Sequence, residues 1–213
     1  MQKNSNKELI VIALKLLAIC AIVAAIVAFV NSVTKDKIAH NELVNTAEAL
    51  NGIYSQEYDG NRFDISDKSD SSSFVMRDEN NTTVAVCDIA SAELLNDVTA
   101  LYIIKDPSGN TDSYCVAVSP MGFKDKINML VAVNTNITVK GVKIVSLSET
   151  SGIGTKVAEP DFLSRFENIN SPVSSKVDTI SGATKSSKPV INAVETALTQ
   201  VAKYINANGG VAQ

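Results

Sequence analysis

The sequence predicts an α+β domain that follows a single amino-terminal membrane helix. The first observation is a long apolar stretch, Leu9 to Val30, near the start of the 213-residue chain. The second is a series of short segments with strand composition between residues 84 and 147, separated by turn residues. The third is an apolar pattern of helical period from Val190 to Ile205. Strands in the middle of a chain with helices at its ends are typical of the α+β class.

The amino-terminal stretch is long enough to cross a membrane. Leu9 to Val30 contains one charged residue, Lys15. At about 1.5 Å per helical residue it matches a bilayer core of about 30 Å, and Lys15 is close enough to the end to reach the headgroups. A cleaved signal peptide is the alternative, but the stretch is long and no Ala-x-Ala site follows it. We therefore expect residues 1–34 to be a cytoplasmic tip and an uncleaved anchor in the cell membrane.

Basic residues flank this anchor unevenly. Lys3, Lys7 and Lys15 stand on its near side, and Lys35 and Lys37 stand on its far side. Positive residues favour the cytoplasmic side, so this small excess predicts a cytoplasmic amino terminus. The rest of the chain then lies on the extracytoplasmic side.

The segment after the anchor divides into a helix and a loop. Lys35 to Tyr54 carries apolar residues near one helical face and can continue the membrane helix. Ser55 to Ser73 is polar, with Gly60 and a serine run, which is typical of a loop. We expect residues 35–80 to connect the anchor to a folded domain in residues 81–213.

An antiparallel meander is predicted for the middle of the chain. Short turns separate its expected strands, because Pro107 presets φ and Gly109 accepts a positive φ, while Met121-Gly122-Phe123 interrupts the pattern. Short connections of this kind join neighbouring antiparallel strands. The expected strands are Val84 to Val86, Val98 to Ile104, Tyr114 to Val118, Ile127 to Val133 and Ile137 to Leu147.

Two helices are predicted after the strands. Pro160 to Phe166 is expected to form a short helix, and the pattern up to Ile205 marks a long terminal one. Pro189 fits the first turn of the terminal helix, where its missing N–H costs nothing. Ser186 or Ser187 can then cap this helix.

Composition argues against several functions. The net charge of −4 argues against nucleic acid as a partner. The single histidine, His40, and three cysteines without a C-x-x-C pair predict no metal site. Cys87 and Cys115 fall in or beside strands and can either pair, if the domain faces outward, or remain buried thiols. Cys20 alone does not make a cluster-binding site.

A stretch rich in hydroxyl groups precedes the terminal helix, and it reads Asp178-Thr179-Ile180-Ser181-Gly182-Ala183-Thr184-Lys185. Gly182 lets the backbone approach a ligand closely, and free N–H groups at a helix start favour an anion such as phosphate. From the pattern alone, a serine-rich loop with an ordinary helix cap is the simpler interpretation.

The same stretch closely resembles the flavinylation motif of FMN-binding domains. In that family the last threonine, here Thr184, carries FMN through a phosphoester, and a dedicated flavin transferase makes the bond from FAD. Lys185 stands where the family often has Ser or Thr, which is a mild departure. The resemblance implies that the residues that bind or position the cofactor are Asp178, Ser181, Gly182, Ala183 and Lys185, beside the attachment residue Thr184.

A second segment, Glu149-Thr150-Ser151-Gly152-Ile153-Gly154-Thr155, resembles the E-T-P-G-L-G loop of the same family. Two glycines at this spacing allow a backbone turn against a flat ring. For Glu149, a solvated loop carboxylate is an equally simple interpretation. The resemblance implies that the residues near the flavin are Glu149, Thr150, Gly152, Gly154 and Thr155.

The order of anchor, strands and motifs resembles the G subunit of the Rnf complex, a membrane ferredoxin:NAD⁺ oxidoreductase that pumps Na⁺ or H⁺. The resemblance implies a flavoprotein subunit that relays electrons between neighbouring subunits and has no substrate turnover of its own. Its implied partners are the other Rnf subunits, membrane lipid and, during maturation, the flavin transferase. The alternatives are the C subunit of a Na⁺-translocating NADH:quinone reductase, which is usually longer, and an anchored binding or assembly module without a cofactor.

Overall fold

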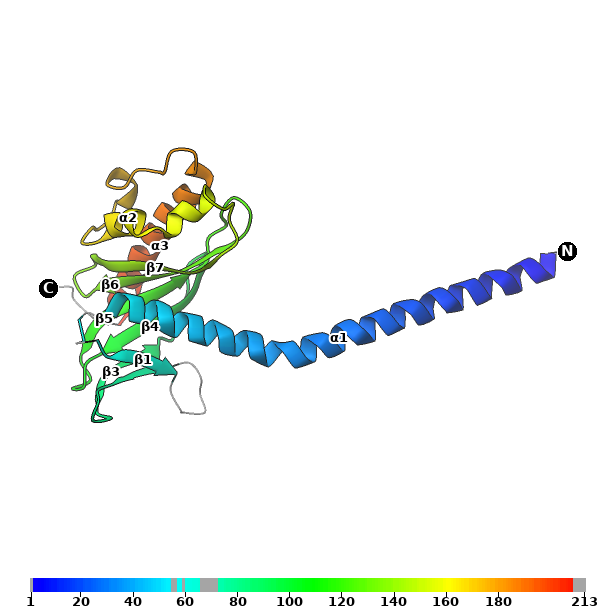
Figure 1. The fold of residues 1–213 in the computed structure, drawn as a ribbon, viewed down its shortest axis with the longest axis horizontal. Helices are drawn as coiled ribbons and strands as arrows, with labels where there is room; N and C mark the ends of the chain where they lie inside the picture. Colours follow the sequence, from blue (N-terminus) through cyan, green and yellow to red (C-terminus); the bar gives the residue numbers. More distant parts are fainter. Residues whose placement is uncertain (1, 55–56, 59, 66–72, 209–213) are drawn as a thin grey trace. The chain divides into compact units, whose positions relative to one another are not determined.

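The computed structural model describes residues 2–54, 57–58, 60–65 and 73–208 (Figure 1). The chain forms two compact units, Met1–Leu43 and Val44–Gln213, which are described separately. The three-part division predicted from the sequence stays a prediction.

The first unit consists of most of one long helix, α1, which runs over Gln2–Tyr54. The predicted membrane stretch and the helix after it are therefore one continuous element. Val11–Tyr54 is the part of the described chain that is long and apolar enough to cross a membrane. Its large apolar side chains between Val11 and Val33 are exposed, as is expected for a helix surface that faces lipid.

An antiparallel sheet of seven strands forms the body of the second unit. Each strand pairs with the next one along the chain, so the sheet is the predicted meander and the α+β class is confirmed. Its strands are β1 (Arg62–Ile65), β2 (Phe74–Arg77), β3 (Thr83–Ile89), β4 (Val98–Lys105), β5 (Thr111–Val118), β6 (Ile127–Asn134) and β7 (Val139–Leu147). β7 begins two residues later than expected because Ile137 lies in the preceding turn with a φ of 60°.

Two strands at one edge of the sheet were not expected. β1 lies inside the segment predicted as a loop, so that prediction is wrong for Arg62–Ile65. A strand of four residues has too few positions for an alternating pattern to stand out. Its position depends on a distant contact instead, because the Asn51 side chain of α1 accepts the Phe63 N–H at 2.5 Å and donates to the Phe63 carbonyl at 3.1 Å.

Short helices and one long helix follow the sheet. The predicted helix over Pro160 to Phe166 is two consecutive elements, α2 and η2. The helical elements are η1 (Gly154–Ala158), α2 (Pro160–Leu163), η2 (Ser164–Phe166), η3 (Val173–Ser175) and α3 (Thr184–Ala207).

Helix α3 starts earlier than the sequence predicts. Ser186 and Ser187 do not cap it, because their N–H groups already donate to the Ala183 carbonyl in the first turn. Pro189 lies inside the helix, where its missing N–H leaves out only the bond to the Lys185 carbonyl. The last two residues of the hydroxyl-rich stretch, Thr184 and Lys185, therefore belong to the first turn of α3.

The sheet is covered on both faces. Side chains alternate along a strand, so Tyr114 and Val116 of β5 point to one face while Ser113 and Cys115 point to the other. Helix α3 packs on the first face, and Tyr204 of α3 contacts Tyr114 there. The last turns of α1 lie on the second face, where the Tyr54 hydroxyl is 2.9 Å from Ser113 Oγ (Figure 1).

Candidate functional site

A cavity of about 530 Å³ lies where three segments meet. These segments are the loop between β5 and β6, the loop after β7, and the first turn of α3. Its volume falls in the range of small-molecule and cofactor sites. The cavity is lined by Phe123, Glu149, Thr150, Ile153, Gly154, Gly182, Ala183, Thr184, Lys185 and Ser186.

Both sequence motifs contribute to this one cavity. The loop after β7 brings Glu149, Thr150 and Gly154, and the start of α3 brings the stretch from Gly182 to Lys185. The two segments are far apart in the sequence and come together because η1 packs against α3 and Ser186 of α3 donates a hydrogen bond to Glu149. Most of the predicted site residues are therefore neighbours in space.

Four of the predicted site residues do not line the cavity. Thr155 and Gly152 shape the loop, since the Gly152 N–H donates to Thr155 Oγ1 at 2.9 Å and Gly152 has a φ of +73°. Asp178 and Ser181 are exposed outside the cavity. Their involvement with a cofactor stays a prediction.

Thr184, the predicted attachment residue, lies on the wall of the cavity. It is the first residue of α3, and its side chain is exposed on the wall of the cavity. Its hydroxyl makes no hydrogen bond with the described part of the chain, and Ala183 before it provides no side-chain cap. The N–H groups of Thr184 and Lys185 precede the first acceptor of the helix, the Ala183 carbonyl, so they and the helix dipole favour an anion here.

Gly182 is required by its backbone conformation. Its φ is +78°, in the left-handed region, and no atom lies within 4 Å of the position that a Cβ would take. The expectation that Gly182 lets the backbone approach a ligand closely stays a prediction, and the structure adds a conformational reason for this glycine. The open space beside it leaves room for a ligand at the start of the helix.

Glu149 is buried, with 8% of its surface exposed, so the interpretation as a solvated loop carboxylate is wrong. Its Oε2 accepts a hydrogen bond from Ser186 Oγ at 2.6 Å, and its Oε1 accepts one from the Lys124 N–H at 3.0 Å. Burial raises the pKa of Glu149, but these bonds and the N–H groups of Asp125 and Phe123 outweigh it and leave the pKa below its ordinary value. The side chain is therefore a carboxylate at neutral pH.

Sequence reasoning missed three residues of the cavity wall, Phe123, Ile153 and Ser186. Phe123 is 58% exposed and Ile153 is 52% exposed, although both are large and apolar. The Lys185 ammonium lies 5.1 Å from the centre of the Phe123 ring. An aromatic residue in a predicted turn was the available signal for Phe123, because turn residues are usually small or polar.

A second cavity of about 510 Å³ adjoins the first and shares Phe123, Thr184 and Lys185 with it. Lys188, one helical turn after Thr184, is also part of its lining. Two lysines thus stand close to the Thr184 hydroxyl, at the end of the helix that already favours an anion.

The remaining candidates lie outside the cavity. Cys87 and Cys115 are free, buried thiols on β3 and β5, with β4 between them. Two strand spacings amount to about 9–10 Å, which exceeds the Cα separation of a disulfide. Burial raises the pKa of Cys115 to about 12, so this thiol is unreactive at neutral pH. Among the described residues, no group of His, Cys, Asp and Glu side chains is arranged to hold a metal ion.

The cavity residues fit FMN in both shape and charge. A flat apolar ring would cover the exposed Phe123 and Ile153 side chains. A phosphate would lie against the start of α3 near Lys185 and Lys188. Thr184 lines both cavities.

Comparisons with known proteins agree with this assignment. A model of the FMN-binding domain family matches residues 122–199, and a model of the RnfG N-terminal region matches residues 1–53. The chain is similar to the G subunit of the ion-translocating oxidoreductase complex of Methanosarcina acetivorans, with 32% identity over 124 residues. The match covers 54% of this chain and 63% of that relative, which is less than two thirds of the relative's length.

Two solved structures are also similar. The first is Shewanella oneidensis NqrC, with 25% identity, a TM-score of 0.43, and coverage of 51% of this chain and 61% of that one. The second is the C subunit of the Na⁺-translocating NADH-quinone reductase from Parabacteroides distasonis, with 16% identity and a TM-score of 0.46. This match covers 75% of this chain and 92% of that one. The two family matches and the relative from Methanosarcina acetivorans show that this chain is similar to RnfG-type subunits, with residues 122–199 matching the FMN-binding domain family.

Proposed function

We propose that this chain carries FMN on Thr184 and relays electrons as a membrane-anchored subunit of an Rnf-type ion-translocating complex. The observation that carries the proposal is the exposed Thr184 hydroxyl at the start of α3, within the wall of a cofactor-sized cavity. When bound, FMN supplies the redox chemistry, which the protein side chains lack.

Residues around Thr184 have separate tasks in this proposal. The first N–H groups of α3, with Lys185 and Lys188, offset the negative charge of the phosphoester. Phe123 and Ile153 provide an apolar wall for the ring and exclude water from it. No residue in this arrangement is required to turn over a substrate, which agrees with the role of an electron carrier.

Attachment needs a second protein and a nucleotide. A flavin transferase would use FAD: the bond between Thr184 Oγ1 and the FMN phosphorus forms, the pyrophosphate bond breaks, AMP leaves, and the hydroxyl proton is released. The exposed position of Thr184 supports this step, because the transferase must reach the hydroxyl. The other proposed partners are the membrane and peripheral subunits of the complex, and the surrounding lipid.

Native membranes that carry Thr184→Ala test the proposal. Peptide mass spectrometry should find FMN on the peptide with residue 184 in the wild type and none in the variant. Assembled variant complexes should also lose ferredoxin-dependent NAD⁺ reduction, because removal of a middle carrier lengthens an electron-transfer step. NADH oxidation by an artificial acceptor should persist, since the nicotinamide site is elsewhere.

Thr179→Ala is the matched control, because Thr179 is an exposed threonine in the same stretch. It should retain both the flavin and the coupled activity. FMN found on Ser181 or Ser186 would contradict the attachment site. Coupled activity in assembled, flavin-free complexes would contradict the relay.

A further inference from the structure

One carboxylate connects the three segments that form the cavity. Glu149 belongs to the loop after β7, and its two oxygens reach the other two walls. Oε1 accepts the Lys124 N–H of the β5–β6 loop at 3.0 Å, and Oε2 accepts the Ser186 hydroxyl of α3 at 2.6 Å. Within the described residues, the Glu149–Ser186 bond is the one hydrogen bond between side chains that joins the loop of residues 148–153 to α3.

The loops are shaped around this carboxylate. A Cβ on Gly122 would lie 2.4 Å from Glu149 Oε1, and a Cβ on Gly154 would lie 2.8 Å from Glu149 Oε2. Contacts this short do not occur between non-bonded atoms, so both positions exclude a side chain while Glu149 stays where it is. The glycines thus admit the Glu149 side chain between the two loops.

Ser186 is the partner of Glu149 on α3. Its side chain is 3% exposed, and Glu149 is the acceptor recorded for its hydroxyl. A buried hydroxyl without a partner is unfavourable, so the Glu149 carboxylate and Ser186 depend on each other. Ser186 lies two residues after Thr184 in the first turn of α3, so this bond fixes the turn that presents the attachment hydroxyl.

We propose that Glu149 is the positioning residue of the cavity: through Lys124 and Ser186 it holds the Phe123 loop and the start of α3 in a fixed arrangement. The role toward FMN rests on the proposed function, whereas the connection between the segments does not. Without this connection, the Phe123 loop separates from α3, and a flavin on Thr184 keeps its covalent bond but loses its fixed wall.

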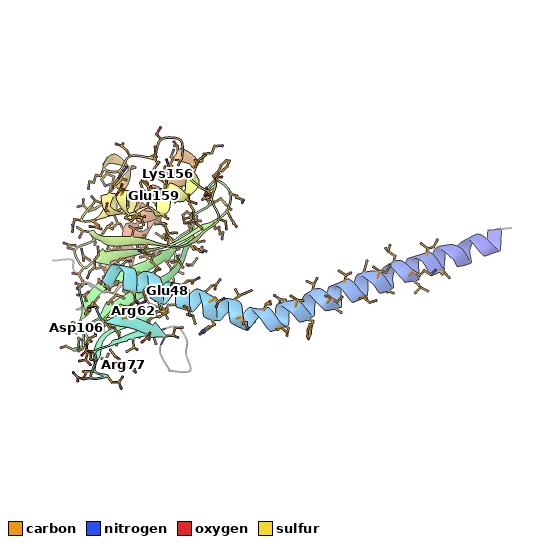
Figure 2. All side chains as sticks on the ribbon, in the orientation of Figure 1. Glu48, Arg62, Arg77, Asp106, Lys156 and Glu159 are labelled. Atoms are coloured by element: carbon orange, nitrogen blue, oxygen red, sulfur yellow. The ribbon has the colours of Figure 1, made fainter. Side chains whose placement is uncertain are left out.

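The connection can be measured without a cofactor. In full-length protein purified without the flavin transferase, Glu149→Ala should speed amide hydrogen exchange in residues 121–126 by about tenfold, the expected effect of losing roughly 1.4 kcal/mol of local stability. Exchange in the central strands β4 to β6 should not change. Glu159→Ala is the control, since Glu159 is an exposed glutamate immediately before α2 (Figure 2).

Flavin mobility provides the second measurement. In flavinylated protein, Glu149→Ala should lower the fluorescence anisotropy of FMN and increase its quenching by iodide, and Ser186→Ala should do so to a smaller extent. Glu149→Gln should restore wild-type values, because its amide oxygen can accept the Lys124 N–H and its NH₂ group can donate to Ser186 Oγ.

The outcomes separate this proposal from the proposed function. Wild-type protein without FMN on residue 184 would contradict the attachment, while the exchange measurement would still test the connection. Unchanged exchange and anisotropy in Glu149→Ala would overturn the positioning role, as would a Glu149→Gln variant as mobile as Glu149→Ala. If Glu149→Ala does not fold, wild-type anisotropy in Ser186→Ala would overturn it instead.

Discussion

Three residues at the start of α3 illustrate how single side chains define the site. Thr184 offers an exposed hydroxyl, Gly182 turns the backbone through a φ of +78°, and Ser186 turns inward to Glu149. Their order in the chain follows from the local geometry, because a left-handed residue ends the preceding segment and lets the helix begin at Thr184. The motif thus meets a backbone requirement, the positive φ of Gly182, and also supplies functional groups.

At this scale, Gly182→Ala should lower the free energy of unfolding by about 1–2 kcal/mol, the cost of an L-residue in the left-handed region. Gly182→Asn should be less destabilising, since asparagine tolerates this conformation better. Urea denaturation followed by circular dichroism measures both. An alanine variant as stable as the wild type would show that the turn can rearrange without strain.

At the scale of elements, the last turns of α1 are part of the sheet domain. Tyr54 is fully buried, and the Lys140 ammonium lies 4.9 Å from the centre of its ring while it pairs with Glu57 at 2.6 Å. Asn51 occupies the free edge of β1 by pairing with the N–H and the carbonyl of Phe63. An unpaired sheet edge is prone to associate with other chains, and this side chain satisfies part of it.

Asn51→Ala should therefore lower the free energy of unfolding by about 2–3 kcal/mol, because two backbone groups of Phe63 lose their partner. Faster amide exchange should be confined to β1 and β2. Glu48→Ala is the matched control, because Glu48 is an exposed residue one turn earlier in the same helix (Figure 2). Equal stability of the two variants would show that β1 does not depend on α1.

At the scale of the whole molecule, the chain consists of an apolar helical unit and a sheet domain with a cofactor-sized cavity. We propose that the sheet domain lies on the extracytoplasmic side of the membrane. The basic residues around the anchor, three before and two after, support an extracytoplasmic domain.

A reporter joined after Gln213 tests this orientation. Alkaline phosphatase, which folds only outside the cytoplasm, should be active in this fusion, whereas a cytoplasmic fluorescent reporter should stay dark. The same reporters joined before Met1 should give the opposite pattern. Fluorescence from the carboxyl-terminal fusion alone would place the domain in the cytoplasm and contradict the proposal.

The sequence by itself determined the features that depend on neighbouring residues. The apolar run of the anchor, the strand composition of β3 to β7 and the helical period of α3 are local patterns, so each was predictable to within a few residues. Both glycine-containing motifs were recognisable through their resemblance to FMN-binding domains, whereas their pattern alone is equally typical of ordinary loops.

Only the tertiary structure decided how these parts meet. β1 depends on Asn51, which comes from another element, and Phe123 joins the cavity because the β5–β6 loop folds against the end of β7. The predicted start of α3 was too late because Pro189 suggested the first turn of the helix. In the structure, the N–H groups of Ser186 and Ser187 already donate hydrogen bonds to the Ala183 carbonyl. Such contacts join residues far apart in the chain or compete with local preferences. Their free energies therefore arise only when the folded sheet holds the segments together.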